Sequence, residues 1–280
     1  MLTKLQAYSS WDDAQTLYLI ENGREETDLI QIRNIDGLDP VKATVNTSPF
    51  GSVDGAAYIG STVPTRNIVL TLHPNPDWKS WSFEKLRRLL YVYFMPKSLT
   101  RLVFHSDDMA PVEIFGYVED FNLAQFSSDI EIQISIICPD PYFTALNPTL
   151  VPGVSSNGTS PIDVMYTGDI ETGFNVEVLR LNAPDPSFIG VQVGDPSISY
   201  FNVSASVNAS AYFVMNSIPG QRYVQNVTMG SGIITNLLSR MQEGSTWPTL
   251  KPGKNKVSVI TDAPPNQAFQ IVYFERYGGL

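Results

Sequence analysis

Residues 130–143, IEIQISIICPDPYF, are the stretch that decides the class of fold. Isoleucine alternates with polar residues from Ile130 to Ile136, and this period of two predicts a strand with one buried and one solvated face. Pro139 and Pro141 end the strand, because proline cannot donate a hydrogen bond to a strand ladder. An antiparallel sheet that packs a core on one side is therefore expected.

Most of the sequence before this stretch also predicts strands. Apolar runs bounded by turn signals place them at residues 17–20, 29–33, 66–72, 102–105 and 112–118. Residues 80–95 have a helical period instead, with Ser80 or Ser82 as the N-cap and Pro96 as the end. The apolar face of this helix consists of Phe83, Leu86, Leu90 and Tyr93/Phe94.

A glycine-rich stretch, residues 50–64, interrupts the strands of the first half. It holds Gly51, Gly55 and Gly60 and too few apolar residues to contribute to a core. We interpret it as an exposed loop or a projecting hairpin.

Proline and small polar residues mark a boundary after the first half. The segment 146–162 contains Pro148, Pro152 and Pro161 among Asn, Gly and Ser, which is typical of an interdomain linker. We therefore predict an N-terminal domain over 1–145 and a C-terminal domain over 163–280. Short strands at 174–181, 212–215, 256–260 and 270–274 predict a β-sandwich for the latter, and 234–241 is a candidate short helix.

Composition excludes several classes of function. The net charge of -10 and the pI of about 4.6 argue against binding nucleic acid or anionic lipid through a general positive field. One cysteine, Cys138, allows no intrachain disulfide. The N-terminus resembles no signal peptide, and no run is apolar enough to span a membrane, so we expect synthesis in a cytoplasm and no membrane partner.

The sequence offers little catalytic chemistry. His73 and His105 lie near strand ends, and Cys138 follows a buried strand, where a small buried hydrophobic residue is the ordinary interpretation. Motifs for zinc, calcium, nucleotide or serine-hydrolase sites are missing. The adjacent carboxylates Asp12-Asp13, Asp107-Asp108 and Glu119-Asp120 point to opposite faces of any strand, so they do not form an acid/base pair. We predict no catalytic, cofactor-binding or metal site, and no enzyme.

Aromatic residues in the second half permit two interpretations. Trp247 and Tyr277 could stack on the apolar faces of a sugar, or the aromatic residues could pack a sandwich core. The solvent exposure of these two rings distinguishes the alternatives.

Several short motifs, taken in order, resemble the distal tail proteins of siphophages. In the first half these are IDGL (35–38), GSVDG (51–55), RNIVL (66–70), LLYVYFMP (89–96), FGYVE (115–119) and ICPDPYF (137–143). In the second half, WPTLKPGKN (247–255) precedes a strand and YFERYGGL (273–280) ends the chain. The motifs cover most of residues 17–280. The resemblance rests on their order along the chain, because each motif alone contains only the residues that are common in turns.

The resemblance implies a mainly β fold: an N-terminal β-sandwich with one α-helix and an extended hairpin, then a C-terminal sandwich similar to galectins or carbohydrate-binding modules. It also implies a homo-hexameric ring at the phage tail tip. Such a ring joins the major tail tube protein to the tail-associated hub or lysin protein and docks receptor-binding or side-fibre proteins. DNA passes the lumen without specific binding, which suits an acidic chain. A carbohydrate-binding accessory module of a phage tail is the alternative.

A head-to-tail ring requires an element that reaches a neighbouring copy. The glycine-rich stretch is the candidate for this element. Its proposed interface residues are Phe50, Gly51, Val53, Tyr58, Ile59 and Val63.

Overall fold

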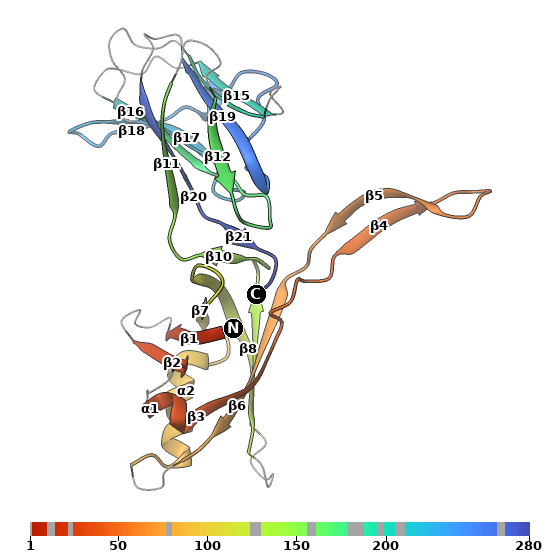
Figure 1. Cartoon of the computed structure of the whole chain (residues 1–280), viewed down its shortest axis with the longest axis vertical. Helices are drawn as coiled ribbons and strands as arrows, with labels where there is room; N and C mark the ends of the chain where they lie inside the picture. Colours follow the sequence, from red (N-terminus) through yellow and green to blue (C-terminus); the bar gives the residue numbers. More distant parts are fainter. Residues whose placement is uncertain are drawn as a thin grey trace. The chain divides into compact units, whose positions relative to one another are not determined.

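The chain forms two compact units in a computed structural model (Figure 1). The structure describes residues 2–9, 15–21, 25–76, 80–123, 130–155, 161–178, 188–194, 199–204, 211–261 and 267–280. The N-terminal unit comprises Met1–Leu146 together with Tyr277–Leu280, and the C-terminal unit comprises Asn147–Arg276. The chain therefore leaves its first unit, builds the second, and returns to the first with its last four residues. The sequence had placed those four residues in the C-terminal domain.

A single hydrogen-bonded sheet dominates the N-terminal unit. Its order is β2-β1-β7-β8-β9-β6-β3, with β10 paired to β8 and β21 paired to β10. Strands β2 and β3 lie at opposite ends of this order and still contact each other, so the sheet curls around one core. The strands are β1 (Leu2–Ser9), β2 (Thr16–Ile20), β3 (Ile30–Asp36), β6 (Arg66–Pro74), β7 (Leu99–Ser106), β8 (Val112–Leu123), β9 (Ile132–Cys138), β10 (Phe143–Ala145) and β21 (Arg276–Tyr277).

The alternation that predicted β9 is confirmed. Ile132, Ile134 and Ile136 are completely buried, while Gln133 between them is exposed. The neighbouring strands follow the same rule: Leu70 of β6 pairs with Ile134, and both lie in the core. One face of the sheet is thus apolar because its strands were patterned with a period of two.

The long helix is also confirmed. Helix α2 spans Phe83–Phe94, and Ser82 caps it by accepting a hydrogen bond from the Lys85 N–H at 3.4 Å. Leu86 and Leu90 are completely buried in the core under the sheet. The sequence did not predict β1 or the five-residue helix α1 (Glu25–Leu29).

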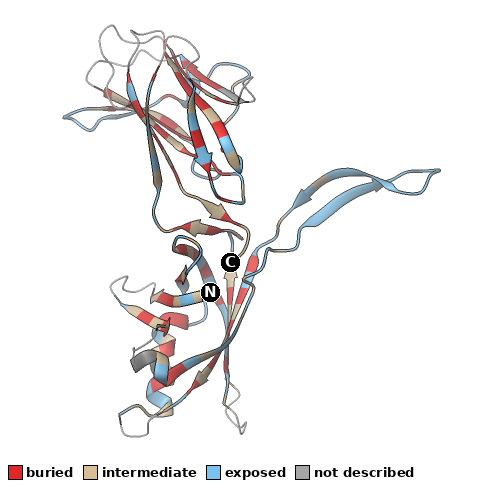
Figure 2. Ribbon diagram, viewed as in Figure 1, coloured by how far each residue is buried: buried red, intermediate tan, exposed pale blue. Residues whose placement is uncertain are grey.

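A two-stranded hairpin stands apart from the sheet. It consists of β4 (Thr44–Pro49) and β5 (Ala56–Thr62), paired with each other and with no other strand among the described residues. A bulge between Asn46 and Thr47 interrupts their register. Figure 2 shows the exposed colour along nearly all of the hairpin, and among residues 44–62 only Gly60 has intermediate burial. The projecting hairpin is therefore confirmed.

The C-terminal unit is a β-sandwich. One sheet has the order β11-β20-β13-β16-β17-β18 and the other β12-β19-β14-β15, and both contribute to one buried core. Their strands are β11 (Thr149–Val154), β12 (Ile162–Tyr166), β13 (Asn175–Val178), β14 (Phe188–Val193), β15 (Ser199–Ser204), β16 (Ala211–Asn216), β17 (Tyr223–Thr228), β18 (Ile234–Asn236), β19 (Gly253–Thr261) and β20 (Ala268–Tyr273). The mainly β fold class is confirmed.

Two sequence predictions in this unit were wrong. The segment 146–162 is not simply a linker, since Thr149–Val154 forms β11, an edge strand that tolerates Pro152. Residues 234–241 are not an α-helix. They form β18 and then the short 3-10 helix η1 (Leu238–Arg240), because Ile234 pairs with Val227 across a tight turn.

Candidate functional site: the hairpin and its base

Large apolar side chains stand in solvent along the β4–β5 hairpin. Val53 is 73% exposed, Ile59 68%, Tyr58 67%, Val45 57% and Phe50 53%. The tip closes through a hydrogen bond from the Phe50 N–H to the Gly55 oxygen at 3.3 Å. Isolated apolar side chains on a surface are ordinary, whereas this many on one narrow ribbon are typical of a binding surface.

The hairpin is also poor in charge. Asp54 at the tip is the single charged residue between positions 44 and 62. Proteins usually protect exposed strand edges with charged side chains, and a two-stranded hairpin is marginally stable alone in water. Its composition suits an element that another surface covers.

The structure places five of the six proposed interface residues together in solvent. Phe50, Gly51, Val53, Tyr58 and Ile59 are all exposed on the hairpin. Their role in an interface stays a prediction. The sixth residue, Val63, lies beyond β5 and is half-buried. The sequence did not predict Val45 as an interface residue, because the polar sequence of β4 lacks the apolar–polar alternation that indicates a strand.

A buried arginine fixes the base of the hairpin. Arg66, the first residue of β6, is 1% exposed. Its guanidinium donates to the main-chain oxygens of Asp39 at 2.8 Å and Pro141 at 2.6 Å, and also to that of Gly37. The ring of Phe143 lies 4.5 Å from the guanidinium carbon. Burial lowers the pKa of Arg66, although nearby acidic groups, Asp39 among them, oppose this shift.

The chain terminus completes this junction. Arg66 donates a further hydrogen bond to the Gly278 oxygen at 2.6 Å, and the Leu280 N–H donates to the Leu38 oxygen at 3.1 Å. We call Arg66 and its four acceptors, Gly37, Asp39, Pro141 and Gly278, the Arg66 junction. It joins the segment before β4, the segment after β9 and the last residues of the chain. The motifs IDGL, RNIVL, ICPDPYF and YFERYGGL all contribute residues to it.

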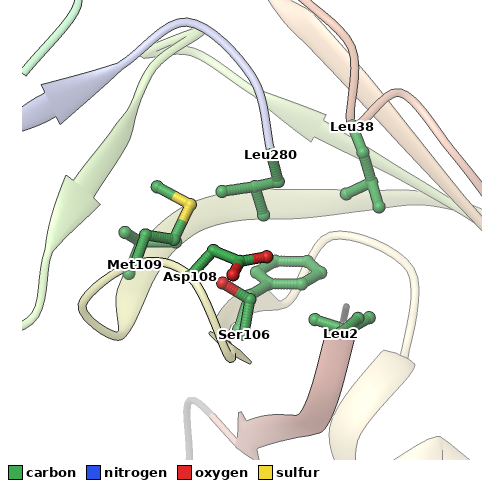
Figure 3. Close-up of a pocket in the computed structure, with 8 residues that line it drawn as sticks. Leu2, Leu38, Ser106, Asp108, Met109 and Leu280 are labelled. Carbon is green, nitrogen blue, oxygen red and sulfur yellow. The ribbon is translucent and has the colours of Figure 1, made fainter.

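A mostly apolar pocket of about 330 Å³ lies beside this junction in the N-terminal unit. Figure 3 shows Leu38, Leu280, Leu2 and Met109 around it, with Asp108 at its side. Such a lining offers shape and apolar contact and little chemistry.

The histidines and Glu119, which were considered as catalytic candidates, make hydrogen bonds within the fold. His105 Nε2 lies 2.9 Å from Gln6 Oε1, and burial lowers the pKa of His105. His73 Nδ1 lies 3.0 Å from the Ile130 oxygen. Glu119 accepts a hydrogen bond from the Ser135 hydroxyl at 3.0 Å, and Asp12-Asp13 fall outside the described residues. Within the described ranges, no three His, Cys, Asp or Glu side chains gather as a metal site would require.

The reactivity of Cys138 tests whether this side chain is buried as the structure shows. Burial raises the pKa of its thiol to about 12, against a smaller opposing effect of the Arg66 charge. At pH 8 roughly one thiol in ten thousand is then ionised, and the thiolate is the reactive form. We expect native protein to resist a thiol reagent such as Ellman's reagent at pH 8 and to react fully in guanidinium. Rapid stoichiometric labelling of the native protein would contradict the burial of this side chain.

Neither of the two aromatic rings considered for sugar stacking presents a fully exposed ring face to solvent. Tyr277 is 9% exposed and belongs to the core of the N-terminal unit, which favours packing over sugar stacking for this ring. Trp247 is half-buried: its ring packs on Phe201 with centroids 5.0 Å apart, and Arg222 lies over it at 5.6 Å. The chain itself therefore occupies much of the ring surface that a sugar would use.

No helix among the described residues is long and apolar enough to cross a membrane.

By sequence, the chain matches no protein-family model and no curated protein. Solved structures do match it. The crystal structure of the phage SPP1 Dit protein, a paradigm of the hub adsorption apparatus in phages that infect Gram-positive bacteria, matches with a TM-score of 0.68 at 16% identity. The match covers 97% of this chain and 98% of that one.

Chains of the phage p2 baseplate are more distant. In the activated conformation with strontium, one matches with a TM-score of 0.50 at 10% identity, covering 96% of this chain and 97% of that chain. The calcium form gives the same score and identity over 100% of both chains. Over nearly its whole length, the chain therefore has the fold of the phage distal tail protein Dit.

Proposed function

We propose that this chain is a structural distal tail protein of a phage. Six copies form a ring at the tail tip. The ring connects the major tail tube protein to the tail-associated hub protein and is a docking platform for receptor-binding or side-fibre proteins. The protein is made in the host cytoplasm and acts in the virion.

The uncovered hairpin is the observation that carries this proposal. It stands on a fold shared over nearly the whole chain with the SPP1 Dit protein, which is described as part of an adsorption hub. This ribbon is poor in charge and leaves Tyr58, Ile59 and Phe50 in solvent within its own chain, and a neighbouring copy would bury them.

The division of labour follows the two units. The N-terminal unit carries the hairpin and forms the ring, and the C-terminal sandwich provides surface for further tail proteins. The Arg66 junction supports the first role, because it fixes the backbone on both sides of the hairpin. A non-enzymatic role fits a site made of apolar contacts and main-chain hydrogen bonds. The acidic chain favours passage of DNA through the lumen without specific binding.

The first test is the mass of the protein in solution. We expect light scattering over a concentration series to reveal a species of six times 31.0 kDa, and negative-stain images to show an open ring. A protein that stays at 31.0 kDa at every concentration would count against self-assembly into a ring.

A variant without the hairpin localises the interface. Residues 46–60 are replaced by two glycines, which joins the paired residues Val45 and Ser61 by a two-residue turn. We expect a folded monomer, since the hairpin makes no strand pairing with the sheet. A hexamer that survives this replacement would show that the ring interface lies elsewhere.

A further inference from the structure

The N-terminal sheet carries a second uncovered apolar surface. Leu99 pairs with Tyr117 and Arg101 pairs with Phe115, so these four side chains point to one face of β7 and β8. Phe115 is 46% exposed, Tyr117 51% and Leu99 37%. The partners on the outer strands extend the row, because Tyr8 of β1 pairs with Arg101 and Ile137 of β9 pairs with Tyr117. We call Tyr8, Leu99, Phe115, Tyr117 and Ile137 the aromatic face.

The aromatic face is opposite the core. Intervening residues such as Leu102 and Ile114 point the other way and are buried with helix α2. Helix α2 is therefore on the far side of the sheet, and the described residues leave Phe115 and Tyr117 in solvent. An aromatic row across four strands is large for a surface that nothing covers.

Arg101 and Glu113 lie beside the aromatic face and neutralise each other, and the exposed Glu119 borders it at the Tyr117 end. Arg101 Nε donates a hydrogen bond to Glu113 Oε2 at 2.7 Å, and Arg101 Nη2 forms an ion pair with the same oxygen at 2.6 Å. Its guanidinium also lies 4.9 Å from the centre of the Tyr8 ring and 5.9 Å from that of Phe115. A partner that covers Tyr8 and Phe115 would bury Arg101 together with its counter-ion, and an unpaired charge is the usual obstacle to burying an arginine.

We propose that the aromatic face receives the β4–β5 hairpin of a second copy of this chain. The inference rests on the proposed function and names the partner surface of the hairpin. Both surfaces are largely apolar, since Asp54 at the tip is the one charged residue of the hairpin and Arg101 is paired with Glu113. A two-stranded ribbon packs on a sheet as one sheet packs on another. Each chain has a net charge of -10, so the copies repel each other, and this repulsion is smallest where two surfaces that are poor in charge meet.

The geometry of assembly follows from the two surfaces being different. A contact between unlike surfaces of identical chains is head to tail, and each copy uses both of its surfaces once the ring closes. The hairpin and the aromatic face of every copy are then covered by the same repeated contact.

Two double variants test the pairing. The hairpin variant carries Tyr58→Ser and Ile59→Ser, and the face variant carries Phe115→Ser and Tyr117→Ser. All four side chains are about half or more exposed, so neither variant removes a side chain from the core of its own chain, and both should keep the wild-type circular dichroism spectrum. Met165→Ser is the matched control, because Met165 is 62% exposed on β12 of the other unit.

We expect each variant alone to fall sixfold in mass, to 31.0 kDa, and Met165→Ser to match the wild type. An equimolar mixture of the two variants should form a 1:1 dimer and stop there. The intact hairpin of the face variant can occupy the intact face of the hairpin variant, and no second contact remains.

The outcomes separate this inference from the proposed function. A hairpin variant that dissociates beside a face variant that still forms the ring overturns the aromatic face and leaves the proposed ring standing. Two monomeric variants that do not pair when mixed also overturn it. A hairpin variant that remains hexameric overturns the hairpin interface and this inference together.

Cross-linking gives a measurement that does not depend on the stability of the serine variants. The variant Ile59→Cys with Tyr117→Cys has one thiol on each surface, while native Cys138 is buried. Under mild oxidation it should form covalent chains of two to six copies on a non-reducing gel, and each single-cysteine variant should form far fewer. A double variant that remains a single-copy band would overturn the proposed contact.

Discussion

Arg66→Met is expected to destabilise the N-terminal unit by about 3–5 kcal/mol. This is the range found when one member of a buried, charged hydrogen-bonded group is removed. The guanidinium donates to four main-chain oxygens, and it is 1% exposed. Methionine fills part of the volume and can donate to none of them, so buried acceptors are left unpaired. For a unit of this size the melting temperature should fall by roughly 10 °C.

Tryptophan fluorescence can report this unit alone. Trp247 is the one tryptophan of the C-terminal unit, whereas Trp11, Trp78 and Trp81 belong to the N-terminal unit. Urea unfolding in a Trp247→Phe background therefore follows the unit that contains Arg66. The control is Arg88→Met on the exposed side of helix α2, which should change stability by about 0.5 kcal/mol or less.

Replacement by lysine refines the same prediction. Arg66→Lys keeps the charge but loses the planar fork that reaches several oxygens at once, so we expect it to recover only part of the loss. A Met variant as stable as the wild type would mean that the four hydrogen bonds contribute no net stability. That result would contradict our description of the junction.

Gly37→Ala should be the other severely destabilising change, with an expected cost of about 3 kcal/mol or more. Gly37 has a φ of +88°, which side chains with a β-carbon rarely adopt. A β-carbon there would also collide with the main-chain oxygen of Asn67. The backbone must shift to relieve the clash, and that shift moves the Gly37 oxygen away from Arg66.

Gly51→Ala is the matched control for this prediction. Gly51 lies at the hairpin tip, and a β-carbon built there meets nothing within 4 Å. It should leave the urea midpoint of the N-terminal unit unchanged, while Gly37→Ala lowers it clearly. Equal effects of the two substitutions would show that the close approach of Gly37 to Asn67 is not a constraint on the fold.

The sequence alone determined the parts of this protein that depend on local period. The isoleucine alternation of residues 130–136 predicted β9 and its buried face, and the spacing of Leu86 and Leu90 predicted helix α2 with its Ser82 cap. These elements were readable because a strand or helix buries one face at fixed intervals. The glycine-rich stretch predicted a projecting element for a related reason, since it offered no face to bury.

The aromatic face and the strand β4 could not be predicted from local sequence period. Phe115 and Tyr117 look like core residues of an alternating strand, and only the pairing of β7 with β8 puts them outside, opposite helix α2. Strand β4, with the sequence TVNTSP, has no pattern at all. Its conformation follows from its pairing with β5.

The Arg66 junction is the clearest case of a site that only the tertiary structure decided. An arginine at the start of a strand is ordinarily a surface residue, and nothing near it in the sequence predicts otherwise. Its acceptors at Gly37, Pro141 and Gly278 lie 29, 75 and 212 residues away along the chain. A charge can be buried only when groups from several segments converge to replace water. Local sequence does not record that convergence, and the fold supplies it when the last residues of the chain return to the first unit.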